Sequence, residues 1–432
     1  FALTILVGAL VLMLPVSAAD GQITPFLDAL FTAASASCVT GLVTVSTAVH
    51  WSVFGKCVIL LLIQIGGLGF MSVAAIASFV LRRTITLHER MVMSAGLNLS
   101  DGGGIVRLTR RVLFGTFIIE GTGAVLLSCR FVPHYGFPKG ITMGVFHAVS
   151  AFCNAGFDLM GTPDDPFQSL IGWAEDPLVN ITVMALIVLG GLGFFVWSDV
   201  WDKHSFCRLR LHTKIVLTAT AGLLLFGFGW TLLFEWSNPA TLGAFDTPHK
   251  LLAAAFESVT LRTAGFNTID LGALTGPSQA VSCLLMFIGG SPGSTAGGIK
   301  TVTAAVLVLT AISAFCGRTT VSAFGRTIAP RSIMNAVTLL MAGGVLCLVG
   351  ACAIAGIEDA PFHQCLFEAV SAFGTVGVSM GLTPTLSAAS CVILIVMMYM
   401  GRVGVLTLGV AVFMRRREPP RLKYPDADVF IG

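Results

Sequence analysis

Long apolar stretches without charged residues recur along the chain and set its basic pattern. The ranges 57–81, 178–198, 215–234 and 332–357 contain no Asp, Glu, Lys or Arg. Each reaches or exceeds the roughly 20 residues that an α-helix needs to cross the hydrocarbon core of a bilayer. Transmembrane β-strands would be about 10 residues long and alternate in polarity. The pattern therefore predicts an all-α, multi-pass protein of the cell membrane.

Short polar stretches that end in glycine interrupt this pattern four times. They read FTAASASCVTGL, FHAVSAFCNAGF, FESVTLRTAGF and FEAVSAFGTVGV, and they begin at Phe31, Phe146, Phe256 and Phe367. Their glycines, at spacings of 115, 109 and 112 residues, are Gly41, Gly156, Gly265 and Gly377. Such even spacing indicates four copies of one unit. The third copy is one residue shorter, so we do not expect its turn to superpose closely on the others.

Each copy predicts an apolar helix, an amphipathic half-helix, a glycine-ended turn and a second apolar helix. A second glycine landmark follows each turn, at Gly66-Gly67, Gly190-Gly191, Gly289-Gly290 and Gly401. We expect eight spanning helices and four re-entrant half-helices around one central pore. The expected units are repeat 1 (1–81), repeat 2 (112–200), repeat 3 (215–315, with a broken second helix) and repeat 4 (332–414). Cytoplasmic linkers are expected at 82–111, 201–214 and 316–331, and a cytoplasmic tail at 415–432.

The four turns suggest a pathway for a cation. Non-helical backbone at membrane depth is tolerated only where it is buried in protein or lines a water-filled cavity. Glycine lets carbonyl groups point inward and lets four chains crowd one axis. A ring of carbonyl oxygens can then replace the hydration shell of a monovalent cation. The alternative is that these glycines only permit close helix packing. For the second glycine landmarks, the packing role and a pore role are equally open.

Charge is distributed unevenly between the predicted two sides of the membrane. Of the 25 Lys and Arg, 18 lie in the connections after the repeats, which we therefore place in the cytoplasm. The opposite connections are acidic, and an acidic mouth attracts cations. These acids are Asp20, Asp28, Asp158, Asp164, Asp165, Glu175, Asp176, Glu235, Asp246, Glu257, Asp270, Glu358, Asp359 and Glu368. We expect Glu257 and Glu368 at half-helix N-termini, where the helix dipole favours negative charge.

Composition narrows the function classes further. Hydrophobic residues make up 55% of the chain, charged residues 11%, and the mean hydropathy is +0.89. A net charge of +3 gives no reason to expect a nucleic-acid partner. The 11 cysteines form no C-x-x-C pair, so neither a zinc site nor a disulfide framework is predicted. The spans carry no nucleophile-and-base pair, so we do not expect an enzyme. The chain begins at Phe1 within an apolar stretch, and a short N-terminus is expected to precede it.

A glycine-rich interruption distinguishes the second helix of repeat 3. The sequence GGSPGSTAGGIK breaks the run from Val281 to Phe315, and its glycines and Pro292 cannot hold a straight helix. We expect a mobile loop below the turns, with a static kink as the alternative.

Four charged residues lie deep in this apolar sequence. A central Lys or Arg costs roughly 2.5 to 3.5 kcal/mol on insertion scales. Arg402 is expected to face the pore and limit cation flow until this loop moves, to donate to carbonyls of the loop, or both. Lys300 also needs a partner. Arg262 is expected to brace its turn against Glu257 or Glu368, and Glu120 to pair within the bundle.

Several motifs together carry a family resemblance over nearly the whole chain. They are VTGL, FCNAGF, RTAGFNTID, GTVGVSMG, GGSPGSTAGGIKT and GRVG. The chain resembles the Trk/Ktr/HKT superfamily of potassium uptake proteins, and most closely the Ktr-type membrane subunit. The resemblance implies that potassium binds backbone carbonyls of a selectivity filter made of Val39, Thr40, Gly41, Asn154, Ala155, Gly156, Thr263, Ala264, Gly265, Thr375, Val376 and Gly377. It implies a gate made of Gly289, Gly290, Ser291, Pro292, Gly293, Ser294, Thr295, Ala296, Gly297, Gly298, Lys300 and Arg402.

The resemblance also implies partners and ions. It implies a homodimer in membrane lipid, each protomer with its own pore, regulated by a cytosolic KtrA-like ring that holds the nucleotide. This chain would bind no cofactor, potassium would be the permeant ion, and sodium is a candidate activator. Only VTG and TVG look like potassium-channel filters, so selectivity could be looser. A secondary transporter for sodium or ammonium is the alternative. Such transporters usually carry inverted repeats and midplane acids, whereas these repeats run in the same direction and Glu120 is the only clear intramembrane acid in the sequence.

Overall fold

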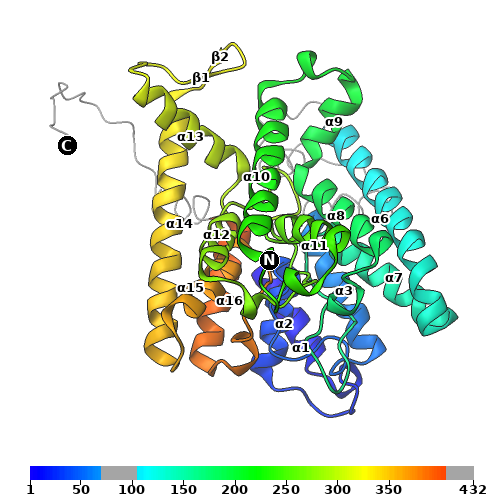
Figure 1. Cartoon of the computed structure of the whole chain (residues 1–432). Helices are drawn as coiled ribbons and strands as arrows, with labels where there is room; N and C mark the ends of the chain where they lie inside the picture. The colour runs from blue at the N-terminus through cyan, green and yellow to red at the C-terminus, as the bar shows by residue number, and fades with distance from the viewer. Residues whose placement is uncertain (70–104, 405–432) are drawn as a thin grey trace.

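The computed structural model describes residues 1–69 and 105–404 as a bundle of helices (Figure 1). The expected boundaries within 70–104 and 405–432, including most of the first linker, the end of repeat 4 and the tail, lie outside the described residues. So do Arg82, Arg83, Arg90 and the basic residues of the tail.

The helices follow the four predicted copies in order. Copy 1 contains α1 (Ala2–Leu12), α2 (Phe26–Cys38) and α3 (Val53–Leu68). Copy 2 contains α6 (Ile105–Tyr135), α7 (Phe137–Phe152), α8 (Pro177–Leu192) and α9 (Phe194–Lys203). Copy 3 contains α10 (Leu211–Glu235), α11 (Thr247–Thr260), α12 (Gly276–Phe287) and α13 (Thr301–Phe315). A hairpin of β1 (Ser322–Ala323) and β2 (Arg326–Thr327) precedes α14 (Pro330–Ile357), α15 (Phe362–Gly374) and α16 (Ala388–Val403).

Only some of these helices are long enough to cross a bilayer. In the described ranges, three helices qualify by length and composition, within α6, α10 and α14. Five shorter apolar helices have 11 to 16 residues, namely α1, α2, α3, α13 and α16. These long helices expose apolar side chains such as Phe117, Leu225 and Val345, as expected of a surface that lipid covers. Membrane-spanning helices are therefore present.

One predicted span is not continuous. The uncharged run 178–198 is divided between α8 and α9, which meet at an angle of 92°. Gly193 at the break has φ +92, in the left-handed region, and a helix cannot continue through such a residue. The Phe194 amide then donates to the Gly293 carbonyl at 2.9 Å instead of to its own helix. Apolar composition alone does not reveal this bend.

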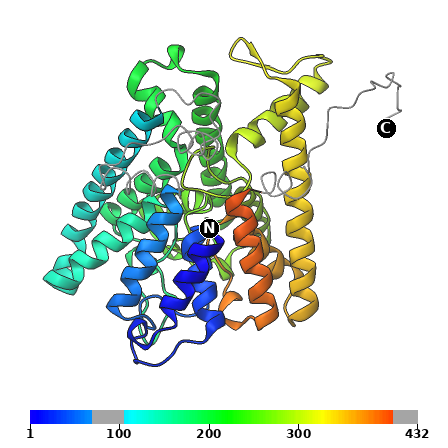
Figure 2. The same cartoon turned by 180° about the vertical axis from the view of Figure 1, so that it is seen from behind.

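The four copies close into a ring. Copy 1 packs on copy 2 through α3 and α7, and copy 2 on copy 3 through α8 and α11. Copy 3 packs on copy 4 through α12 and α15, and copy 4 returns to copy 1 through α16 and α2. Figure 2 shows this last contact, where the orange α16 stands beside the blue N-terminal helices. The leading phenylalanine of each copy lies buried in this core: Phe31, Phe146, Phe256 and Phe367.

Candidate functional site

The four glycine turns share one backbone pattern. Two residues before each glycine, the chain adopts the left-handed region at Val39, Asn154, Thr263 and Thr375, with φ between 52 and 72. Each glycine is left-handed as well, with φ of +100, +69, +83 and +92 in chain order. Left-handed backbone is costly for branched residues, so it persists only where the surroundings impose it. The third turn keeps this pattern despite its missing residue.

A hydroxyl side chain braces each turn, and the sequence interpretation overlooked it. The Ser371 hydroxyl donates to the Val378 carbonyl at 2.6 Å and accepts from the Gly377 amide at 3.2 Å. The Ser150 and Thr260 hydroxyls likewise donate to the carbonyl of the residue after their glycine. The Ser35 hydroxyl accepts a hydrogen bond from the Gly41 amide. A Ser or Thr six residues before the glycine, or five in the shorter copy, is visible in all four stretches.

The four turns meet in cyclic order. A Cβ built on Gly41 would lie 2.5 Å from the carbonyl oxygen of Ala155, in the next copy. The same construction on Gly156, Gly265 and Gly377 reaches the carbonyl oxygens of Ala264, Val376 and Thr40, at 2.8, 2.7 and 2.1 Å. Each glycine therefore abuts the carbonyl that precedes the glycine of the following copy, and the fourth returns to the first. No side chain fits at any of the four positions.

A cavity of about 450 Å³ lies against this ring. All four turn glycines line it, together with residues that follow them in the chain. Among the acids predicted to form a mouth, Asp158 and Asp270 line the cavity. Burial raises the pKa of the Asp158 carboxyl to about 6, against the opposing effects of the Met160 and Gly161 amides and the Ser169 hydroxyl. Asp158 therefore titrates just below neutral pH.

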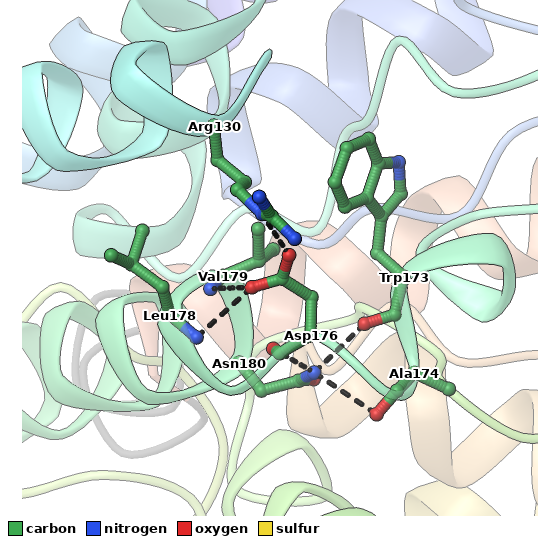
Figure 3. Close-up of polar contacts among 7 residues, drawn as sticks. All are labelled: Arg130, Trp173, Ala174, Asp176, Leu178, Val179 and Asn180. Atoms are coloured by element: carbon green, nitrogen blue, oxygen red, sulfur yellow. Dashed lines mark hydrogen bonds and ion pairs between the residues drawn. The ribbon is translucent and has the colours of Figure 1, made fainter. Parts of the chain in front are cut away.

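The loop that precedes α8 is held by the start of that helix (Figure 3). Asp176 caps α8 by accepting from the Leu178 and Val179 amides at 3.0 and 3.1 Å, and it pairs with Arg130 of α6. The Asn180 side-chain amide donates to three carbonyls of the preceding loop, including that of Trp173 at 2.8 Å. These bonds hold the loop whose Phe167, Ser169 and Ile171 face the cavity.

The predicted gate loop packs on the opposite side of the turns. The Gly297 amide donates to the Thr375 hydroxyl at 3.0 Å, so the loop touches the fourth turn. The Thr295 hydroxyl lies 3.3 Å from the Asn154 side-chain amide of the second turn. Backbone bonds from Ser291 and Thr295 to Gly191 and Gly190 tie the loop to α8. The ring of glycines thus lies between the cavity and the loop.

Two basic residues bind carbonyls around this loop. The Arg402 guanidinium donates to the Thr295 carbonyl of the loop and to the Gly66 and Gly67 carbonyls at the end of α3. The Lys300 ammonium donates to the Ala296 carbonyl at 2.6 Å. Arg402 therefore donates to a carbonyl of the loop, as expected.

The expected brace between Arg262 and a glutamate is wrong. Arg262 donates to the carbonyls of Thr220 and Gly289 and to the Thr301 hydroxyl, at 3.2 to 3.4 Å. It thereby holds the start of the predicted gate loop. The expected positions of Glu257 and Glu368 at half-helix N-termini are wrong as well. The helix α11 begins at Thr247 and α15 at Phe362, so both residues lie well inside their helices.

Glu120 finds the partner that the sequence did not identify. The Gln64 side-chain amide of α3 donates to both Glu120 oxygens at 3.2 Å, and the Cys153 thiol lies 3.8 Å away. These contacts join copies 1 and 2 near the end of α7. Because the three residues come from α3, from α6 and from the position after α7, no local pattern could have predicted the cluster.

In copies 1, 2 and 4 the second glycine landmark has a packing role. A Cβ on Gly66 would lie 2.2 Å from the Ser37 carbonyl oxygen, and one on Gly190 would lie 1.9 Å from that of Phe152. A Cβ on Gly401 would likewise lie 1.9 Å from the Phe373 carbonyl oxygen. In each case the second helix touches the end of the half-helix that carries the turn. These glycines therefore position the ring from behind.

The comparisons with known proteins agree with this architecture. Residues 6–418 match the family model TrkH, described as a cation transport protein. The chain is 42% identical to the Ktr system potassium uptake protein B of Bacillus subtilis, and 40% identical to the potassium/sodium uptake protein NtpJ of Enterococcus hirae. Both alignments cover 100% of this chain and 95% of the relative.

A solved structure has the same fold. The crystal structure of the potassium transporter TrkH from Vibrio parahaemolyticus aligns with a TM-score of 0.72 at 17% identity. The alignment covers 96% of this chain and 83% of that one. The expected family and the multi-pass membrane location are confirmed, and the protein is a transporter and not an enzyme. The chain belongs to the TrkH family of cation transport proteins.

Proposed function

We propose that the chain takes up potassium across the cell membrane through the ring formed by its four turns. The cyclic contact of each turn glycine with the next copy's carbonyl carries this proposal. Four converging carbonyl groups offer oxygen ligands that can replace the hydration shell of a monovalent cation. Two relatives that are at least 40% identical are named as uptake proteins for potassium, or for potassium and sodium.

The proposed filter consists of the twelve residues predicted from the sequence, from Val39–Gly41, Asn154–Gly156, Thr263–Gly265 and Thr375–Gly377. Their backbone carbonyls would bind the ion. The side chains of Asn154 and Thr263 lie 3.2 Å apart and are engaged with each other. Those side chains therefore serve the turn structure, and the carbonyls remain the ligands.

The proposed gate is the loop from Gly289 to Lys300 together with Arg402. The loop occupies the exit side of the ring, and its bonds to Thr375 and Asn154 would have to break for ions to leave. The Arg402 charge beside the exit opposes a cation until the loop moves. We propose that a cytosolic nucleotide-binding ring of the Ktr type drives this movement.

The remaining assignments belong to the same proposal. Eight crossings arise if α1, α3, α13, α16 and the bent pair α8–α9 also cross the bilayer, with α2 as a re-entrant half-helix and the connections after each repeat in the cytoplasm. The domain boundaries are those predicted from the repeats. Two copies would form a homodimer with one pore each, and sodium would act as an activator.

Rubidium entry into bacteria that lack their own potassium uptake tests this function. The parent chain, expressed with a cognate nucleotide-binding ring, should restore growth at micromolar potassium and carry rubidium. Gly265→Ser should lose rubidium affinity or selectivity, because its Cβ would meet the Val376 carbonyl oxygen at 2.7 Å. Gly222→Ser in α10, where a Cβ meets nothing within 4 Å, is the matched control.

Equal membrane levels of the three proteins are required for the comparison. Failure of the parent to restore uptake would refute potassium transport. Equal rubidium affinity and selectivity in the Gly265→Ser and Gly222→Ser proteins would reduce the turn glycines to a packing role.

A further inference from the structure

The half-helix of copies 2 and 4 holds the segment that leaves its own turn. In copy 4 the Met380 amide donates to the Glu368 carboxylate at 3.1 Å. In copy 2 the Leu159 amide donates to Nε2 of His147 at 3.3 Å. Met380 and Leu159 each lie three positions after their turn glycine, and Glu368 and His147 each follow the leading phenylalanine. The same anchor therefore occurs twice, with two different side chains.

Copy 1 anchors the same position from one helical turn earlier. Thr32 follows the leading phenylalanine there, and its hydroxyl has no hydrogen-bond partner within 1–69 and 105–404. Asp28, four residues before Thr32, accepts instead from the Thr44 hydroxyl at 2.9 Å. Thr44 again lies three positions after the turn glycine. Since residues four apart share one face of a helix, the anchor comes from the same face of the half-helix.

Copy 3 has no such anchor on its own half-helix. The equivalent Glu257 is buried, and its carboxylate oxygens have no hydrogen-bond partner in the described part of the chain. The segment after the third turn is held from copy 2 instead. The Asn267 amide donates to the Ser169 hydroxyl at 3.1 Å, and its carbonyl accepts from the Leu170 amide at 2.9 Å. All four segments are thus tied down, the third by the loop before α8.

The histidine shows which property of the anchor matters. Nδ1 of His147 lies 2.7 Å from the Met143 carbonyl oxygen, which can only accept, so Nδ1 carries the proton. Nε2 of the neutral ring is then free to accept from the Leu159 amide. Copy 2 therefore anchors its segment without a negative charge.

The two carboxylates make the same kind of contact. Glu368 is fully buried, and the hydroxyls of Ser379 and Thr383 donate to it in addition to the Met380 amide. Neither Glu368 nor Asp28 lines the cavity against the ring. Both were expected from the sequence to be charges of an acidic mouth. What they share with the histidine is an acceptor for the segment that leaves the turn.

We propose that Asp28, His147 and Glu368 position the ring and act as hydrogen-bond acceptors, not as charges that attract cations. The inference rests on the proposed function, because it assigns these anchors to ion selection. Each ties its segment down two residues beyond the one that follows the turn glycine. Hydrogen bonds from supporting side chains hold a binding geometry in place. Without an anchor the carbonyls could shift, and selection between monovalent cations depends on their arrangement.

Rubidium entry with sodium as competitor, in bacteria that lack their own potassium uptake, tests the anchors. Glu368→Gln keeps an acceptor oxygen and removes the charge, whereas Glu368→Ala removes both. Asp28→Asn and Asp28→Ala form a second pair of the same design. Both alanine variants should lose several-fold of the preference for rubidium over sodium, and both amide variants should keep the parental preference. Asp359→Ala, at an exposed acid of copy 4, controls for the loss of a carboxylate.

The outcomes separate the anchors from the function on which they rest. An equal loss of preference in the amide and alanine variants would overturn the acceptor role and assign the effect to charge. Parental preference in both alanine variants, at parental membrane levels, would show that the anchors do not position the ring. The Asp28 pair decides the question if Glu368→Ala does not reach the membrane. A parent that carries no rubidium would refute potassium uptake itself, and the anchors' part in ion selection with it.

Discussion

At the scale of single residues, the most expensive feature of the turns is left-handed backbone at branched side chains. Val39, Thr263 and Thr375 all have positive φ, and such a conformation costs of order 1–3 kcal/mol per residue. The hydroxyl brace in each copy offsets this cost, because it satisfies the amide or carbonyl that the turn leaves buried. The repeated Ser or Thr is therefore part of the ring's construction.

Removal of one brace should loosen the ring. Ser371→Ala leaves the Gly377 amide and the Val378 carbonyl without their side-chain partner, and a buried unpaired group costs about 1–3 kcal/mol. We predict a several-fold loss of rubidium preference over sodium at a normal membrane level. Competition of sodium with rubidium entry measures it, with the exposed Thr338→Ala of α14 as control. An unchanged rubidium preference in Ser371→Ala would show that this hydroxyl brace does not contribute to selectivity.

The sequence predicted those site residues whose type is set by local backbone geometry. It did not predict the contacts that depend on the tertiary structure. The turn glycines could be named because nothing larger fits a left-handed, crowded position. The partners of Arg262 could not be predicted, because Thr220, Gly289 and Thr301 come from three separate segments. The same holds for Gln64 beside Glu120.

At the scale of elements, breaks in the second helices organise the proposed exit side of the ring. The described part of α3, of α8 and of α16 each ends at a left-handed glycine, Gly69, Gly193 and Gly404. Only the break after α12 was predicted, because Pro292 and several neighbouring glycines indicate the end of a helix in the sequence. A lone glycine in an apolar run is compatible with a straight helix, so the bend at Gly193 needed the structure.

Release of the gate loop should speed transport. Arg402→Ala removes donors to the Thr295, Gly66 and Gly67 carbonyls and removes a positive charge beside the exit. We predict a several-fold higher maximal rate of rubidium entry, even without the nucleotide-binding ring. Arg331→Ala, at the exposed start of α14, controls for the loss of one arginine. If the two variants carry rubidium at the same rate, Arg402 does not limit ion flow.

At the scale of the whole molecule, four copies surround one axis and leave a cavity on one side of it. This arrangement followed from the even repeat spacing, and the closure of the ring through α16 and α2 agrees with it. The number of crossings did not follow as directly, because only three described helices meet the length of a bilayer on their own. Short apolar helices depend on their neighbours to define their depth.

The charge at the cavity should make uptake sensitive to pH. The Asp158 carboxyl has its pKa raised to about 6, so it is mostly ionised at pH 7 and mostly neutral at pH 5. Its loss of charge should raise the KM for rubidium about twofold, as expected for one charge acting across a hydrated cavity. Asp158→Asn should show the higher KM at both pH values. The exposed Asp164→Asn should behave like the parent; a pH effect that survives in Asp158→Asn would assign it elsewhere.

The most direct test of the ring is the position of a heavy monovalent cation in a crystal of the protein grown in rubidium chloride. The account predicts an anomalous rubidium peak on the axis of the four turns, within about 3 Å of backbone carbonyls contributed by all four copies. Replacement of rubidium by choline should remove that peak. Rubidium found only in the cavity or at the surface, with none on the axis, would contradict a carbonyl filter at these glycines.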